Sequence, residues 1–485
     1  MQLARLFKDF SLYSIEPVAF KIVSFLLLPL YTAYLLPAEF GELQFIISLG
    51  TFLRSVSQFG LNTAFWKFKN DFPSEKLPDL SFNVMATQLY IGSIVVALSS
   101  IVVFATEESN WKWLFIFYLL ALLVKLISEN YLMVSRASQQ PKLYLRITLT
   151  QLVVFVTCNI LFITTLGWGI FGIVSAYMVA FMLTSMVYYR RMKSLVVGSL
   201  SKDLQKKLVA FGGPLLLGNL SILILSISDR WFLMTFSTET ELGLYSYGYK
   251  FADLLGTFMT YAFQLAWAPL AWKAITNDAG RKLYFQVEKL IMIGFPVFVL
   301  LSLPVLFFVA RFITVNPEFI AGLNITYIIA FSHIFYAYYS FNSVKNLHFN
   351  KRNNIVSGNI VAAVLNTALN IALITTHGML GAALATIISY IVMYAWIEFV
   401  RIPELDSYKN HRWKLLVINI IALAACTGIT VMQFGNASEW TIALSSFAAA
   451  LVLVALSFLL GIISRSSMVK LKDEFISLRK KPTPH

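Results

Sequence analysis

The sequence has 485 residues, of which 58% are hydrophobic and 13% are charged, and its formal net charge is +14. This composition excludes a soluble globular protein, because too few polar residues are present to cover a water-exposed surface. The only two cysteines, Cys158 and Cys426, both lie in apolar segments, so we expect neither a metal centre nor a disulfide framework.

Apolar stretches of about twenty residues recur along the chain, and each is long enough to cross the hydrocarbon core of a bilayer. We predict that fourteen of them span the membrane. The first seven lie near residues 10–35, 41–66, 80–104, 111–134, 145–166, 168–189 and 209–233. The second seven lie near 243–272, 285–309, 319–343, 355–376, 378–400, 413–433 and 440–463. The predicted fold class is an all-α polytopic membrane protein whose first span is retained in the mature chain.

The loops between these spans alternate between basic and non-basic, as the positive-inside rule requires of a correct span count. The basic side includes Arg5, Lys8, Lys67, Lys69, Arg136, Arg190, Arg191, Lys345, Arg401 and Lys480. The opposite side has only Lys112 and Arg311 among several glutamates. We therefore expect both termini in the cytoplasm, and we interpret the positive charge as membrane topology without a nucleic-acid partner.

Two segments that lie six spans apart share a pattern. Residues 159–165 and 370–376 both read Asn-Ile-x-x-Ile-Thr-Thr, and a Gly-x-x-Gly pair follows each of them. An even spacing gives both copies the same direction, as in transporters built from parallel repeats, although helix packing alone also favours such glycines. We predict an N-terminal lobe (1–200) and a C-terminal lobe (201–401) of six helices each, with a cleft between them. Residues 402–485 then form two further helices and a basic tail.

Several charged residues lie inside the predicted spans, where a charge at the bilayer centre costs about 2.5–3.5 kcal/mol. Lys125 and Glu129 are four residues apart, and Lys250 and Asp253 are three apart, so each pair fits one helix face. Pairing and function are equally good explanations for both. The dipeptide at 229–230, Asp-Arg, lies near a span end, where a structural role is favoured and the arginine can reach the interface.

Lys21 and Arg54 lie near the predicted midplane on consecutive spans. Glu16 is five residues from Lys21 and therefore points to another face, so it does not neutralise both cations. We expect Lys21 and Arg54 to line a water-filled cavity and to bind an anion, since arginine matches phosphate oxygens bidentately. Lys250, on the eighth span, is the candidate third cation.

Sequence signals of an enzyme are missing. The chain has no Walker motif, and no cluster of histidine, cysteine and carboxylate has metal-ligand spacing. We expect a protein without enzymatic activity, cofactor or metal, whose transport depends on a membrane potential or an ion gradient. Glu129 and Asp253 are candidates for energy coupling, while Glu16 and Lys125 are candidates for coupling or for charge pairing.

A series of short motifs resembles the polysaccharide-transporter branch of the MOP superfamily, which includes the Wzx-type flippases. The motifs are Leu36–Gly41, Gln58–Asn62, Ser228–Arg230, Gly243–Ser246, the helix with Asn366 and Asn370, and Gly378–Thr386. The resemblance covers nearly the whole chain and rests on the order and spacing of the motifs. It implies a fourteen-helix, two-lobed fold of the bacterial inner membrane.

The resemblance also implies a function. Such proteins move undecaprenyl-diphosphate-linked oligosaccharides, the repeat units of O-antigen, capsule or exopolysaccharide, from the cytoplasmic to the periplasmic leaflet by alternating access. In related lipid II flippases, basic residues on the first, second and eighth helices contribute to a cationic cavity. Lys21, Arg54 and Lys250 lie on the corresponding spans here. The implied partners are the lipid-linked substrate, membrane lipids and the glycan polymerase or glycosyltransferases.

Two alternative functions remain open. A cation-coupled multidrug exporter of the same superfamily needs an acidic site, which Glu16, Glu129 or Asp253 could supply. A membrane scaffold for glycan assembly, with no transport of its own, would not need the midplane cations. Drug susceptibility and surface glycan in a deletion strain separate these alternatives from a flippase.

Overall fold

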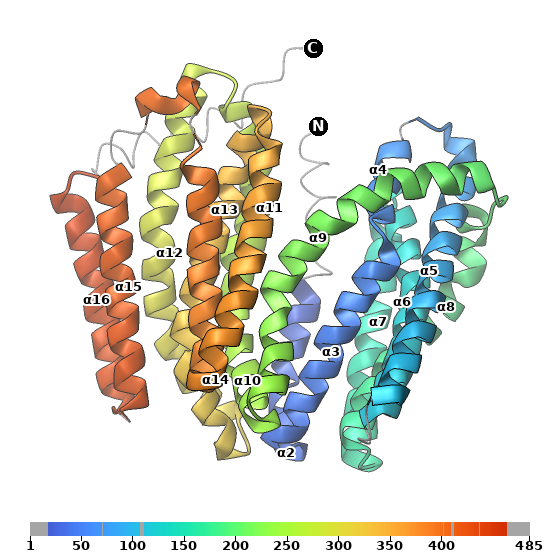
Figure 1. Ribbon diagram of the computed structural model, residues 1–485, viewed down its shortest axis with the longest axis horizontal. Helices are drawn as coiled ribbons and strands as arrows, with labels where there is room; N and C mark the ends of the chain where they lie inside the picture. The colour runs from blue at the N-terminus through green and yellow to red at the C-terminus, as the bar shows by residue number, and fades with distance from the viewer. Residues whose placement is uncertain are drawn as a thin grey trace. The chain divides into compact units, whose positions relative to one another are not determined.

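The structure is a computed structural model that describes residues 18–69, 71–106, 111–400, 402–408, 412–435 and 437–462. Within these ranges the chain forms helices and no strands (Figure 1). Ten of the described helices are long and apolar enough to cross a membrane. The prediction of an all-α polytopic membrane protein is confirmed.

The chain divides into two compact units, and the first contains Met1–Ser246 with Thr314–Phe319. Its elements include the apolar segment Val18–Tyr34, which ends in α2 (Leu28–Tyr34), followed by α3 (Pro37–Gln58), α4 (Leu61–Lys69), α5 (Leu77–Thr106), α6 (Trp111–Ala137), α7 (Pro141–Ile160), the π-helical turn η2 (Leu161–Thr165), α8 (Gly169–Val196) and α9 (Lys202–Phe236). Helices α6, α7 and α8 pack against one another, and α5 covers α6 and α3.

The second unit contains Tyr247–Ile313 and Ile320–His485. Its elements are the remainder of α10 (Glu239–Thr257), η3 (Phe258–Ala262), α11 (Phe263–Ala274), α12 (Asp278–Ile313), most of η4 (Pro317–Ile325), α13 (Thr326–His348), α14 (Arg352–Glu398), η5 (Pro403–Tyr408), α15 (Arg412–Phe434) and α16 (Glu439–Leu459). Helix α13 is central, since it packs against α11, α12, α14 and α15. Figure 1 shows α15 and α16 side by side next to α12, and both helices contact α12.

The fourteen predicted spans map onto these helices. One candidate membrane helix, α14, covers both the span at 355–376 and the span at 378–400. Three predicted spans fall on helices that are shorter or less apolar, namely the segment Val18–Tyr34, α3 with α4, and α10 with η3 and α11. The predicted lobe boundaries near residues 200 and 401 rest on the internal repeat and stay a prediction.

The repeated Asn and Gly residues adopt similar conformations in the two copies. Gly169, at the start of α8, has φ of 50°, and Gly378 breaks α14 with φ of 52°. Positive φ values favour glycine because a Cβ would clash with the backbone. Asn159 and Asn370 are both fully buried. In each copy a buried asparagine therefore lies in the helical segment that precedes a glycine with positive φ, where the next helix begins.

A close backbone approach positions the polar part of α3 and α4. Phe59 and Gly60 separate these helices with φ of 48° and 69°. A side chain at Gly60 would overlap the Gly212 carbonyl of α9, so glycine is required by contact as well as by conformation. Pro214 follows inside α9, and α9 is bent in Figure 1, with contacts to both α4 and α3. Proline removes a backbone hydrogen bond and is a common cause of such bends.

Candidate functional site

Four polar residues meet between α3 and α6 inside the first unit. Arg54 Nη1 donates to Glu129 Oε1 at 2.7 Å, and Gln58 Nε2 donates to Glu129 Oε2 at 2.8 Å. Lys125 Nζ lies 3.8 Å from Glu129 Oε1 and 5.3 Å from the centre of the Phe181 ring. We call Arg54, Gln58, Lys125 and Glu129 the open cluster.

The open cluster is charged and partly accessible. The exposed fractions of the Arg54, Glu129 and Lys125 side chains are 22%, 23% and 30%. Two cations surround one carboxylate, so the cluster has an excess positive charge. In an apolar bundle, charged side chains with this exposure are expected to face a water-filled space, because hydrocarbon disfavours them. The cluster therefore has the charge and the access that an anion site needs.

Only part of this arrangement is predictable from the sequence. Of the two explanations left open for Lys125 and Glu129, the structure shows a contact, at the long end of the range for an ion pair, and their functional role stays a prediction. Glu16 alone was considered as a neutralising carboxylate for Lys21 and Arg54, whereas the structure pairs Arg54 with Glu129 across 75 residues of sequence. Helix packing brings these residues together, and the spacing along one helix cannot reveal it. Gln58 belongs to one of the motifs that resemble the family and had no assigned role. Its side chain donates a hydrogen bond to the second oxygen of Glu129.

The other predicted site residues lie elsewhere. Lys21, on the segment Val18–Tyr34, is partly buried, as are Lys250 and Asp253 on α10. All three make contacts of their own. Glu16 lies outside the described residues. The convergence of Lys21, Arg54 and Lys250 on one anion stays a prediction, as does the coupling role of Glu129 and Asp253.

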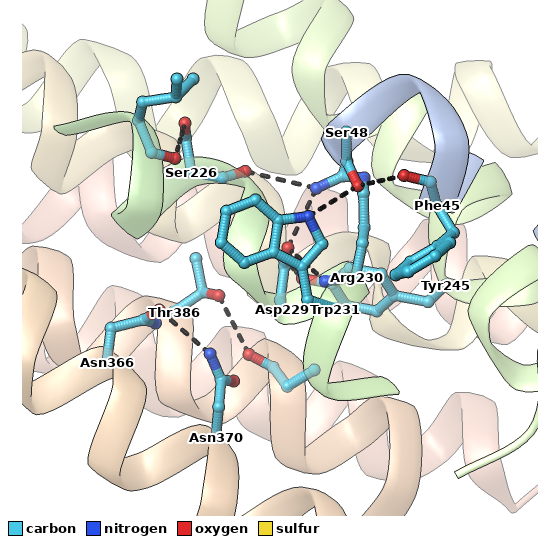
Figure 2. A network of polar contacts seen from close by, with 12 residues as sticks. Phe45, Ser48, Ser226, Asp229, Arg230, Trp231, Tyr245, Asn366, Asn370 and Thr386 are labelled. Atoms are coloured by element: carbon cyan, nitrogen blue, oxygen red, sulfur yellow. Dashed lines mark hydrogen bonds and ion pairs between the residues drawn. The ribbon is translucent and has the colours of Figure 1, made fainter. Parts of the chain in front are cut away.

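A second polar network lies at the end of α9 and contains the Asp-Arg dipeptide. Arg230 Nη1 lies 3.0 Å from Asp229 Oδ1 and donates to the Ser226 carbonyl at 3.3 Å, and the Tyr245 hydroxyl donates to Asp229 Oδ2. Figure 2 shows the Arg230 side chain folded back toward Asp229 and Ser226. The exposed fractions of Asp229 and Arg230 are 2% and 12%, so the two residues form a largely buried ion pair, which agrees with the structural role favoured from the sequence.

The resemblance motifs of the first unit meet around this network. A Cβ on Gly243, at the start of α10, would overlap the Pro37 carbonyl of α3, and a Cβ on Gly41 would overlap the Glu239 carbonyl. The Trp231 indole donates to Ser48 Oγ of α3 at 3.0 Å (Figure 2). Segments 36–41, 228–230 and 243–246 therefore join α3, α9 and α10. This contact gives these motifs a structural role.

Asn366 and Asn370, which belong to the motifs that resemble the family, form a pair in α14. Asn370 Nδ2 donates to Asn366 Oδ1 at 3.0 Å, and Figure 2 shows the two side chains pointing toward each other. Both residues are fully buried inside the second unit. Buried amides need such partners, because an unsatisfied polar group in an apolar interior is costly.

A third cluster, in the second unit, was missed by the sequence analysis. Lys345 Nζ of α13 lies 2.5 Å from Glu398 Oε2 of α14 and 3.9 Å from Glu288 Oε1 of α12. We call Lys345, Glu288 and Glu398 the buried cluster, because their side chains are 1%, 9% and 13% exposed. The sequence places Lys345 in a basic loop after the span at 319–343, and the structure differs. Lys345 lies in the last turn of α13, where Glu398 neutralises it.

Comparison with known proteins identifies the family. A family model described as "polysaccharide biosynthesis protein" matches residues 6–274, which is more than half of the chain. The chain belongs to this family. No curated protein sequence matches it significantly.

Solved structures similar to this polysaccharide biosynthesis protein show the MOP superfamily fold. The lipid II flippase MurJ, in an inward closed conformation, is similar with a TM-score of 0.68 and 15% identity over 93% of this chain and 100% of that one. An inward-facing multidrug resistance MATE family transporter gives 0.60 and 14%, covering 80% and 96%. A MOP superfamily transporter from Pyrococcus furiosus gives 0.54 and 14%, covering 83% and 96%. The predicted membership in the polysaccharide branch of this superfamily is confirmed.

Proposed function

We propose that the chain is a flippase that moves undecaprenyl-diphosphate-linked oligosaccharide from the cytoplasmic to the periplasmic leaflet of a bacterial inner membrane by alternating access. Family membership and the likeness to a lipid II flippase support a transporter of lipid-linked substrates. The alternation of basic loops supports cytoplasmic termini. O-antigen, capsule and exopolysaccharide repeat units are the candidate cargoes.

The open cluster is the observation that carries the proposal. Its excess positive charge attracts an anionic headgroup, and its partial exposure makes the charge accessible to one. Arg54 has five N–H donors, and within the described part of the chain its contact with Glu129 uses the donor at Nη1. The remaining donors suit phosphate oxygens, which a guanidinium binds bidentately. A diphosphate headgroup fits this chemistry better than a neutral lipid does.

The test measures translocation in proteoliposomes loaded with undecaprenyl-diphosphate oligosaccharide. We expect Arg54→Ala to reduce the initial rate at least tenfold and Arg54→Lys to retain part of it, because lysine keeps the charge but loses the bidentate geometry. Arg311→Ala is the matched control, since Arg311 also pairs with a glutamate, Glu439, but at an exposed position. Undiminished translocation after replacement of Lys21, Arg54 and Lys250 together by alanine, at normal protein levels, would refute the cationic site.

A multidrug exporter is the second candidate, because the fold is shared with a MATE family transporter and the open cluster contains the carboxylate Glu129. The two functions give different phenotypes. A flippase deletion alters surface glycan and leaves drug tolerance nearly unchanged, whereas an exporter deletion has the reverse effect. For either function we propose dependence on an ion gradient or membrane potential. Unchanged transport in vesicles without any gradient would contradict this dependence.

A further inference from the structure

A polar pocket of about 170 Å³ adjoins the open cluster within the first unit. Seven side chains from α3, α4 and α6 line it, namely Gln58, Asn62, Trp66, Glu129, Leu132, Met133 and Arg136. Five of these seven carry a hydrogen-bonding group, which is unusual between helices that are otherwise apolar. At roughly 30 Å³ per water molecule the pocket has room for a small polar group of several atoms.

Regular spacing on two facing helices builds this pocket. On α3 and α4, Arg54, Gln58 and Asn62 follow one another at intervals of four residues, which places such residues on one helix face. The turn at Phe59 and Gly60 interrupts the helix, and the pocket nevertheless receives side chains from both sides of it.

The facing helix α6 contributes a second polar row. Lys125, Glu129 and Arg136 recur at intervals of four and seven residues, again on one face. Hydrogen bonds from Arg54 and Gln58 to Glu129 join the two rows beside the pocket. The result is a polar stripe with the cations Arg54 and Lys125 at one end and the pocket at the other.

The pocket presents donors and acceptors together. Glu129 accepts hydrogen bonds, whereas Arg136 only donates them, and the amides of Gln58 and Asn62 do both. Asn62 Oδ1 accepts from Gln88 at 2.9 Å, which orients the Asn62 amide nitrogen as a donor. Hydroxyl groups match such a mixture because each of them both donates and accepts. A phosphate, which mainly accepts, fits the open cluster better, because two cations lie beside Glu129 there.

Two aromatic rings contact Arg136, a pocket residue that is exposed to solvent. The Arg136 guanidinium lies 6.0 Å from the centre of the Trp66 ring and 5.5 Å from that of Tyr144. Contacts of this kind fix the direction of a guanidinium without using its N–H donors. Arg136 is exposed, while Leu132 and Met133 are buried beneath the pocket. The donors of Arg136 are therefore directed by the rings and accessible to a ligand.

We propose that this pocket binds the sugar residue attached to the diphosphate of the substrate and selects it by its hydroxyl pattern. The inference rests on the proposed flippase function and adds the substrate feature that is recognised. Arg54 and the pocket residue Gln58 donate to the two oxygens of one carboxylate, Glu129, which itself lines the pocket, so the cationic end of the stripe directly adjoins the pocket. This adjacency suits a diphosphate at the cationic end of the stripe and a sugar ring in the pocket.

The test compares two kinds of probe on the purified full-length protein. One is undecaprenyl diphosphate without a sugar, and the others are undecaprenyl diphosphates that carry glucose, galactose or N-acetylglucosamine. We expect the wild type to bind at least one sugar-bearing probe about tenfold more tightly than the sugarless one, which corresponds to one or two net hydrogen bonds. Asn62→Ala should abolish this preference and leave the affinity for the sugarless probe unchanged. Arg136→Gln should weaken the sugar-bearing probe by a larger factor than the sugarless one.

Two controls make the outcomes distinct. Arg54→Ala should weaken both kinds of probe equally, and Lys69→Ala should change neither, because Lys69 lies near Trp66 but does not line the pocket. Arg136→Gln serves if Asn62→Ala folds poorly, since Arg136 is exposed. A wild type without preference for any sugar, or pocket variants that weaken all probes equally, would overturn the sugar site alone. Failure of the wild type to bind any diphosphate probe would overturn the proposed function.

Discussion

The open cluster and the buried cluster have the same chemistry in different surroundings. Each combines lysine or arginine with glutamate across packed helices. The open cluster has an excess of cations and side chains that are 22–30% exposed, whereas Lys345 in the buried cluster is 1% exposed between two carboxylates. Screening by solvent weakens the first set of interactions, and the absence of solvent makes the second set costly to disturb. The exposed fraction of the side chains therefore distinguishes charges that a ligand can reach from charges that stabilise the fold.

The largest expected effect is the loss of Lys345. Lys345→Met leaves Glu398 and Glu288 without the ammonium that neutralises them, and removing one partner of a buried ion pair costs about 3–5 kcal/mol. We expect the free energy of unfolding in detergent to fall by that amount. Lys351→Met is the control, because Lys351 lies nearby in sequence and is exposed. Equal stability of the two variants would show that the buried cluster is solvated.

The next prediction sharpens the explanation of that loss. Replacement of Lys345, Glu288 and Glu398 together by methionine removes the uncompensated charge as well as the ion pair. Apolar replacement of a whole buried ion pair is often neutral or stabilising by about 1–4 kcal/mol. The triple variant should therefore be more stable than Lys345→Met alone and should retain translocation. A triple variant less stable than the single one would mean that the carboxylates contribute through other partners.

Arg54 should show the opposite balance of effects. Arg54→Met removes a partly exposed ion pair, so we expect a stability loss of about 1 kcal/mol or less. Translocation should nevertheless fall at least tenfold if Arg54 binds the headgroup. Thermal unfolding and transport measured on the same preparation test both parts. A loss of stability as large as that of Lys345→Met would place Arg54 with the structural charges.

Hydropathy and helix breakers made most of the fold predictable. Every predicted span overlaps a described helix, and the glycine at 378 divides α14 at the place where the repeat ends one span and begins the next. Hydropathy also misled, because a charged residue near an apolar stretch was taken as the start of a loop. Lys345 lies in the last turn of α13, where its buried charge is compensated by Glu398, 53 residues away in sequence.

The candidate site was less predictable for the same reason. The contact of Lys125 with Glu129 could be foreseen as one of two alternatives, because residues four apart on one helix have a fixed geometry. The pairing of Arg54 with Glu129 depends on how α3 packs against α6, and no local spacing encodes that. The motif at 58–62 was recognised without its roles. In the structure Gln58 donates a hydrogen bond to Glu129, and Phe59 and Gly60 form the turn between α3 and α4. The amide of Asn62 is oriented by a hydrogen bond from Gln88.

The smallest expected stability effect gives the sharpest test of the comparison. Lys125→Met removes an ion pair between residues four apart, which is worth about 0.3–0.5 kcal/mol, so unfolding should hardly change. It also removes the excess positive charge of the open cluster and should reduce the affinity for a diphosphate lipid severalfold. Lys282→Met is the matched control, because Lys282 pairs with Asp278 at the same spacing and 3.9 Å but is 65% exposed. If both variants bind the lipid equally well, the excess charge of the open cluster does not attract the headgroup, and Arg54 alone would have to bind it.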